Sequence, residues 1–138
     1  MTETMTLLPH ALPACAGARI ALFAIRRMGA HGLADARAAH VIFTTFGQRF
    51  RRPLILTRTL MAELASTAEG TIAIAPCCCP RMTPAEQILL AVLARVHDAP
   101  EAAQLLMADL LGVRCVESVL MAAAAMSAAF ADEGRPID

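Results

Sequence analysis

Two prolines bracket three consecutive cysteines, Pro76-Cys77-Cys78-Cys79-Pro80, and this stretch constrains the fold of the chain more than any other. Each proline biases the residue before it towards extended backbone, so no regular helix runs through this segment. The sequence on either side is rich in alanine and leucine, and its apolar residues recur with helical spacing. The chain is therefore expected to be helical on both sides of a short break.

Six helices are predicted around this break. Before it they cover residues 14–30, residues 33–50 and a segment that begins at Pro53, since proline suits the first turn of a helix. After it they cover Thr83 to about His97, Asp98–Leu111 and Val113–Ala131. Thr83 followed by Glu86 has the spacing of a capping box, and Asp98 followed by Glu101 repeats it, so Thr83 and Asp98 are both predicted N-caps. Gly112 is predicted to end the fifth helix.

The predicted fold is an all-α, single-domain bundle of about six helices over residues 1–138. Two three-helix halves are joined by the Cys/Pro loop, and residues 71–75 just before it form a short extended segment. We expect residues 1–13 to be a loose N-terminal arm and residues 132–138 to be a polar tail.

The composition favours association. Hydrophobic residues make up 57% of the chain and charged residues only 17%, which leaves little charge to cover a compact monomer. Exposed apolar patches mark interfaces, so we expect a homodimer or another protein partner that covers the alanine-rich last helix. The formal net charge is zero, which argues against a strong field for nucleic acid or membrane. Residues 1–69 carry eight arginines and four acidic residues (+4), and residues 70–138 carry the reverse (−4).

The chain is predicted to be cytoplasmic and not to enter a membrane. Its opening lacks the basic residues that precede the apolar stretch of a secretory signal. The longest apolar run, Val119–Ala131, is short for a membrane span. Thiols stay reduced in the cytoplasm, so the five cysteines are not expected to form disulfides.

The triple cysteine has three interpretations, which the sequence leaves open. Free cysteines often serve as small buried hydrophobes, in which case the loop is a packed elbow. Alternatively, Cys77, Cys78 and Cys79 form a reactive thiol site, with Arg81 holding a thiolate near the start of the next helix. In the third interpretation Cys77 and Cys79, two residues apart, share one side of an extended segment and bind zinc with further distant ligands.

The junction between the second and third predicted helices carries four arginines: Arg49, Arg51, Arg52 and Arg58. They are a candidate docking site for a phosphate, a nucleic acid or an acidic partner, because guanidinium groups bind such anions well. The alternative is that they solvate a bend near a helix C-terminus. Arg26, Arg27 and His31 at the end of the first helix are expected to solvate that end in the same way.

Motifs for catalysis or DNA recognition are not found. The chain has no metal-protease, phosphate-loop or nucleophile-elbow motif, so we assign no catalytic residue, expect no cofactor and favour a role other than an enzyme. The stretch around Gly112 has the form of a helix-turn-helix turn, but Glu117 and a run of alanines follow where base-reading side chains would be needed. Nucleic acid is therefore not an expected partner.

Three blocks of sequence carry a family resemblance: ARIALFAIRRMGAHGL, FRRPLILTRTLMAELA and IAPCCCPRMTPAE, at residues 18–33, 50–65 and 74–86. On these blocks, with CCCPRMTPAE the most specific part, the chain resembles an uncharacterised bacterial family of domains of unknown function. The resemblance implies no activity, cofactor or partner. Our first hypothesis is a protein that acts by association; a thiol- or zinc-dependent protein centred on Cys77 and Cys79 is the alternative.

Overall fold

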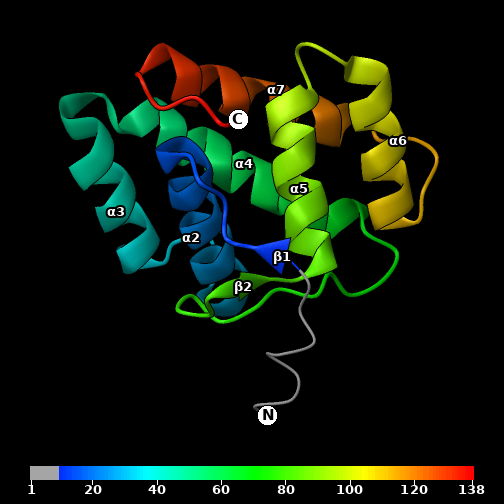
Figure 1. The fold of residues 1–138 in the computed structure, drawn as a ribbon, viewed down its shortest axis with the longest axis horizontal. Helices are drawn as coiled ribbons and strands as arrows, with labels where there is room; N and C mark the ends of the chain where they lie inside the picture. The colour runs from blue at the N-terminus through cyan, green and yellow to red at the C-terminus, as the bar shows by residue number, and fades with distance from the viewer. Residues whose placement is uncertain (1–9) are drawn as a thin grey trace.

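The computed structural model describes residues 10–138, and it confirms an all-α bundle there (Figure 1). The helices in this range are α2 (Ala16–His31), α3 (Ala36–Phe46), α4 (Arg51–Thr67), α5 (Pro84–Arg95), α6 (Pro100–Leu111) and α7 (Glu117–Asp132). A 3₁₀ turn, η1 (Gly47–Arg49), joins α3 to α4. Two short strands, β1 (His10–Ala11) and β2 (Arg81–Met82), pair antiparallel, with His10 opposite Met82.

The helices α2 to α4 precede the cysteine loop and α5 to α7 follow it, but they share one core. The most extensive packing between helices joins the two sides of the loop: α4 runs along α7. The two helices are antiparallel, since Arg52 at the start of α4 reaches Asp132 at the end of α7. Small side chains such as Ala122 and Ala123 are buried on α7, which lets a neighbouring helix approach closely. Much of the apolar surface expected for a partner is therefore used inside the chain, although Met121 remains 73% exposed.

Several helix boundaries differ from the prediction. The second helix begins at Ala36, because the Asp35 side chain accepts a hydrogen bond from the Ala38 backbone at 2.9 Å and acts as the N-cap. It ends at Phe46, since Gly47 has a positive φ of 62°. Glycine adopts this conformation without steric cost. The segment predicted as one helix over residues 33–50 is thus a shorter helix followed by η1.

The last two helices also begin later than predicted. The N-cap of α6 is Ala99, without a side-chain hydrogen bond, and Asp98 is not the cap. Pro100 takes the first helical position, so the cap is the residue directly before it. The helix α7 begins at Glu117 instead of Val113, because the chain turns after Gly112 and buries Val116 before it becomes helical. The capping box at Thr83 and the end of α6 before Gly112 are confirmed.

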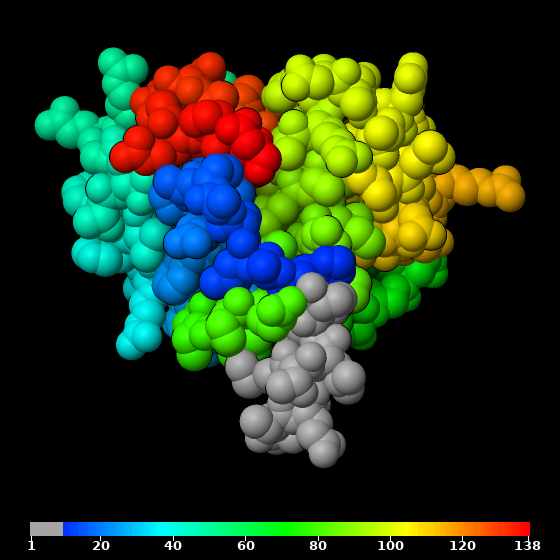
Figure 2. Space-filling model, in the orientation of Figure 1, coloured from blue at the N-terminus to red at the C-terminus, as the bar shows by residue number. Residues whose placement is uncertain are grey.

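Both ends of the described chain contact the bundle. Residues 10 and 11 of the predicted loose arm pair with β2, and residues 1–9 lie outside the described part. The predicted polar tail buries Ile137, which is 4% exposed. Figure 2 shows this tail, in red, lying against the blue start of α2, where a Cβ on Gly17 would overlap the carbonyl oxygens of Arg135 and Pro136.

Among residues 10–138, none of the helices is both long and apolar enough to cross a membrane.

Candidate functional site

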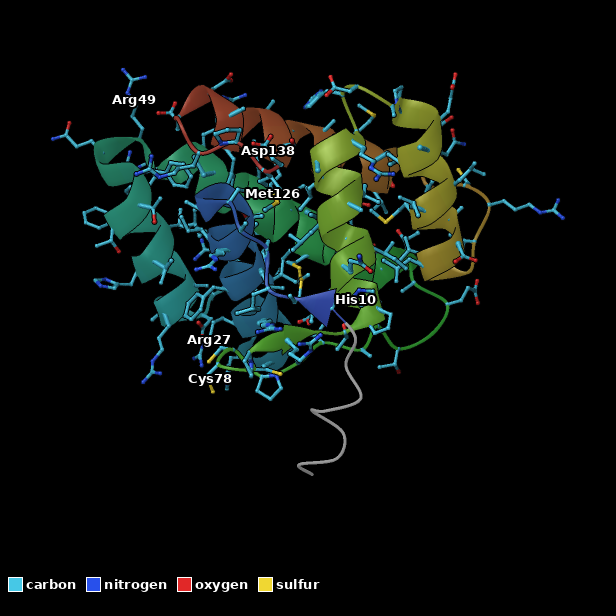
Figure 3. The ribbon with its side chains drawn as sticks, viewed as in Figure 1. His10, Arg27, Arg49, Cys78, Met126 and Asp138 are labelled. Carbon is cyan, nitrogen blue, oxygen red and sulfur yellow. The ribbon has the colours of Figure 1, made fainter. Side chains whose placement is uncertain are left out.

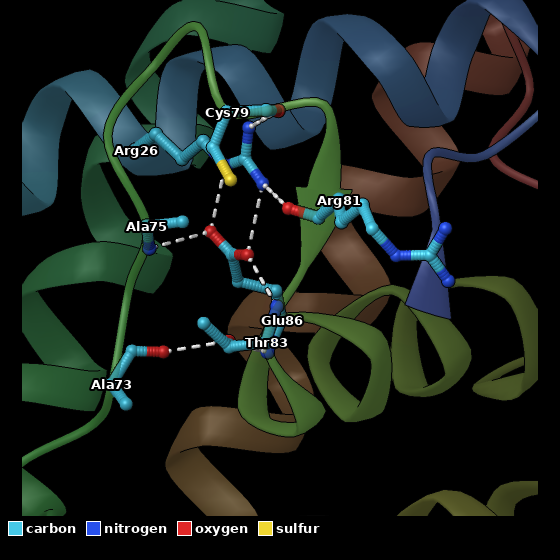
Figure 4. A network of polar contacts seen from close by, with 7 residues as sticks. All are labelled: Arg26, Ala73, Ala75, Cys79, Arg81, Thr83 and Glu86. Atoms are coloured by element: carbon cyan, nitrogen blue, oxygen red, sulfur yellow. Dashed lines mark hydrogen bonds and ion pairs between the residues drawn. The ribbon is translucent and has the colours of Figure 1, made fainter. Parts of the chain in front are cut away.

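Arg26 and Glu86 form a buried ion pair at the base of the cysteine loop (Figure 4). Arg26 Nε donates to Glu86 Oε2 at 2.7 Å and Nη2 donates to Oε1 at 3.0 Å; the two side chains are 2% and 0% exposed. A bidentate contact between guanidinium and carboxylate determines orientation as well as distance. The pair therefore joins α2 to the first turn of α5 across 60 residues of sequence.

The Glu86 carboxylate also receives two backbone N–H groups. Oε1 accepts from Thr83 N at 2.9 Å, which completes the capping box, and Oε2 accepts from Ala75 N at 3.1 Å. With the two bonds from Arg26, the carboxylate reaches the four hydrogen bonds that its oxygens can accept. A buried ion pair is costly unless its remaining polar atoms are also satisfied, and here the carboxylate meets that condition.

The same network holds the backbone of the cysteine loop. Arg26 Nη1 donates to the Cys79 carbonyl at 2.9 Å and Nη2 donates to the Arg81 carbonyl at 2.8 Å. The Thr83 hydroxyl donates to the Ala73 carbonyl at 2.7 Å. Residues 73–83 are therefore attached to the bundle at several points along their length, and the loop has a defined shape.

The cysteines lie in a tight turn, not in an extended segment. Cys79 N donates to the Pro76 carbonyl at 3.0 Å, which closes a four-residue turn. Cys79 is buried, Cys77 is half-buried and Cys78 is exposed. The three thiols therefore meet three different environments, and only Cys79 fits the interpretation of cysteine as a buried hydrophobe.

A cleft of about 550 Å³ opens beside Cys77, between the end of α2 and residues 71–77. Its polar lining comes from Arg26, Arg27, His31, Thr71 and Cys77. The rest is apolar: Gly29, Ala30, Ile72, Ala73, Ile74, Ala75 and Pro76. The volume lies in the range of small-molecule sites, and no acidic residue lines the cleft.

Arg27 lines the cleft together with Cys77. Its Nε and Nη2 donate to Asp35 Oδ2 and Oδ1 at 3.0 and 2.9 Å, which ties the end of α2 to the start of α3. The pKa of Arg27 is raised, chiefly by Asp35 and further by Cys77. The pKa of Asp35 falls from 3.8 to about 2, first because of Arg27 and then because of the Ala38 N–H. In Figure 3, Arg27 and Cys78 lie at the same edge of the molecule.

Arg81, the cation predicted to accompany the cysteines, contributes its backbone carbonyl to the network. Figure 4 shows its side chain pointing away from Cys79. The sequence predicted that three residues only solvate the end of a helix: Arg26, Arg27 and His31. In the structure all three line the cleft, and Arg26 also forms the buried ion pair with Glu86. For Arg26 the expectation of a solvated side chain is wrong. No local pattern identifies its partner, because Glu86 lies on a different helix.

The four arginines of the predicted anion-docking junction lie partly against the end of α7. The contacts are Arg52–Asp132 at 2.8 Å, Arg49–Glu133 at 3.9 Å and Arg58 Nε to the Leu33 carbonyl at 2.9 Å; Arg51 is exposed. An anion at this junction would compete with acidic residues of the same chain. Docking of a phosphate or an acidic partner there stays a prediction.

Within residues 10–138, no three side chains of His, Cys, Asp or Glu are grouped so that they could hold a metal ion. Cys77 and Cys79, the predicted zinc ligands, lie at two positions of one turn but differ in burial. A zinc site with these two ligands stays a prediction.

Comparison with known families places the chain. A model of a family of unknown function (DUF6628) matches residues 2–125, so the chain belongs to that family and the resemblance drawn from the sequence is confirmed. No curated protein and no solved structure matched the chain.

Proposed function

We propose that this member of a family of unknown function is a thiol-dependent sensor of peroxides. Cys77 is its proposed reactive group. The observation that supports the proposal is that Cys77 shares one cleft with Arg27 and His31. A cation beside a thiol favours the thiolate, which is the form that attacks electrophiles. The cleft gives a small oxidant access to that sulfur.

The proposed reaction forms one bond and breaks another. The Cys77 thiolate attacks one oxygen of a hydroperoxide, so a sulfur–oxygen bond forms as the oxygen–oxygen bond breaks. The second oxygen leaves as hydroxide or alkoxide and takes a proton from water, while the cysteine is oxidised to a sulfenic acid. A small thiol then displaces water to give a mixed disulfide, and a second thiol molecule restores the reduced cysteine.

The defined shape of the loop suits this chemistry because it gives the three neighbouring thiols different exposures to solvent. Cys79 is 5% exposed and its carbonyl is held by Arg26, so this thiol is shielded. Cys78 is exposed, on the solvent side of the turn. Return to the reduced form needs a supply of small thiols, so we also propose that the protein resides in the cytoplasm.

The test is to expose the protein to limiting hydrogen peroxide and to trap sulfenic acid with dimedone, with peptide mass spectrometry to locate it. We expect Cys77 to be labelled first, although Cys78 and Cys115 are more exposed. Arg27→Gln is expected to slow labelling about two- to fivefold, the ratio that corresponds to an ion pair of up to about 1 kcal/mol. Arg37→Gln, at an exposed position of α3, is the matched control and should leave the rate unchanged.

Labelling that follows exposure alone, with Cys78 and Cys115 ahead of Cys77, would refute the proposal. So would equal rates for the Arg27→Gln and Arg37→Gln variants. Circular dichroism of each variant establishes that the helical fold is retained, so that a changed rate reports on the thiol.

A second candidate function is association of two copies of the chain. The observation that favours it is Met121, which is 73% exposed on α7, the alanine-rich helix predicted to contact a partner. Half-buried Ala124 and Ala128 lie one and two turns further along this helix. Native mass spectrometry of the reduced protein should then give a dimer that Met121→Glu dissociates. Leu105→Glu, at an equally exposed position of α6, is the matched control and should leave the dimer intact. A wild-type spectrum of monomer alone would exclude this candidate.

A further inference from the structure

The wall of the cleft opposite α2 is mainly apolar, since residues 72–76 line it with Ile, Ala and Pro side chains. Ile72 and Ile74 are half-buried, whereas Thr71 and Ala73 between and before them are exposed, so the two isoleucines face the bundle. They lie opposite the last turn of α2, where Ile74 Cδ1 is so close to Gly29 that a Cβ on this residue would lie 2.9 Å from it. This contact contributes apolar surface to the cleft that Cys77 also lines.

The cleft is larger and less polar than hydrogen peroxide requires. Its volume of about 550 Å³ suits an organic molecule of several carbon atoms. Hydrogen peroxide gains nothing from contact with isoleucine, because it buries no apolar surface. The polar part of the lining is Arg26, Arg27, His31, Thr71 and Cys77, and it contains no acidic residue. The cleft therefore combines an apolar surface for an organic body with a thiol for its reactive end.

Resting on the proposed function, we infer that the cleft selects organic hydroperoxides with an apolar body over hydrogen peroxide. The body contacts Ile72 and Ile74, which leaves the terminal oxygen towards Cys77. The thiolate takes that oxygen, the oxygen–oxygen bond breaks, and the alkoxide takes a proton from water and leaves as the alcohol. The products are one sulfenic acid and one alcohol.

The size of the preference follows from the apolar surface removed from water. Each buried methylene group contributes about fourfold to binding. A body that buries two such groups against the isoleucines therefore gains about tenfold or more. The reference is a small free thiol, whose own ratio of rates with the two oxidants removes the intrinsic difference in their reactivity.

The experiment measures the rate of Cys77 oxidation with cumene hydroperoxide and with hydrogen peroxide. Each rate is divided by the rate at which the same oxidant oxidises N-acetylcysteine. Ala30→Leu narrows the cleft from an exposed position on α2, and Ile72→Ser keeps it open but makes its wall polar. Ala62→Leu, at an exposed position of α4 outside the cleft, is the matched control. The variants Ala30→Leu and Ile72→Ser differ in their effect on packing, so loss of folding in one leaves the other as a test.

We expect a normalised preference of about tenfold for cumene hydroperoxide in the wild type, reduced at least threefold in both cleft variants and retained in Ala62→Leu. The hydrogen peroxide rate should stay the same in all folded variants. Equal normalised rates for the two oxidants in the wild type would overturn the selectivity while leaving the peroxide sensor intact. An absence of Cys77 oxidation by either oxidant would overturn the proposed function itself.

Discussion

Removal of the Glu86 carboxylate is the perturbation that tests most directly how the cysteine loop is held. Glu86→Ala deletes the acceptor for two hydrogen bonds from Arg26 and for the backbone N–H groups of Thr83 and Ala75. It also leaves the Arg26 guanidinium, 2% exposed, without its counter-charge. The carbonyls of Cys79 and Arg81 are then the remaining partners of that cation in the network.

The expected loss of stability is large. Breaking a buried ion pair by removing one partner costs about 3–5 kcal/mol, because an uncompensated charge stays buried. A domain of this size has a free energy of unfolding of about 5–15 kcal/mol. Glu86→Ala is therefore expected to remove about a fifth or more of the stability of the chain.

The double variant Arg26→Met, Glu86→Ala separates the charge from the geometry. No buried charge is left unpaired in it, so its cost should be lower than the sum of the two single costs by at least about 2 kcal/mol. The part that remains reflects the lost bonds to Thr83 N, Ala75 N and the loop carbonyls, each worth about 1 kcal/mol.

Urea unfolding followed by far-UV circular dichroism measures these differences, since the chain contains no Trp and no Tyr for fluorescence. Glu101→Ala is the matched control: Glu101 is also in the first turn of a helix but is exposed, and its replacement should cost at most about 1 kcal/mol. Thiol titration of the same samples should show Cys79 becoming accessible in Glu86→Ala. A cost for Glu86→Ala no greater than that of the control, or additive single and double variants, would refute the role assigned to the pair.

Three further results are expected. The depressed pKa of Asp35 means that its carboxylate stabilises the fold fully above its ordinary pKa of 3.8 and that this contribution is lost as the pH falls towards about 2; urea unfolding at several pH values should show this loss in the wild type and not in Asp35→Asn. Gly17→Ala is expected to lower stability by about 1–3 kcal/mol and to expose the C-terminal segment to proteolysis, because the added Cβ overlaps the Pro136 carbonyl; unchanged unfolding and proteolysis would contradict the packing of this tail. Native mass spectrometry of protein purified without chelator is expected to give no retained metal ion; a zinc mass that disappears in the Cys77→Ser, Cys79→Ser double variant would instead support the zinc hypothesis.

Local features of the fold were predictable from sequence. The capping box at Thr83 and Glu86 was identified from spacing alone, because its hydrogen bonds join residues three apart and need no tertiary contact. Gly112 was identified as a helix end for the same reason: its positive φ of 71° is a property of one residue. The N-cap of α6 was misplaced by one residue, at Asp98, because Pro100 competes with the capping signal for the first helical position.

The site itself depends on tertiary structure. The sequence alone determined that a cysteine-bearing break separates two sets of helices, since Pro76 and Pro80 exclude a regular helix through the residues between them. The packing of α2 against α5 brought Arg26 to Glu86, 60 residues away. Glu86, which spacing identified only as part of a capping box, thereby became one partner of a buried ion pair. The position of the cysteine loop against the end of α2 placed Arg27, His31 and Cys77 in one cleft. Pairing of charges across helices depends on how buried surfaces fit together, and that information is not present in any single segment of the chain.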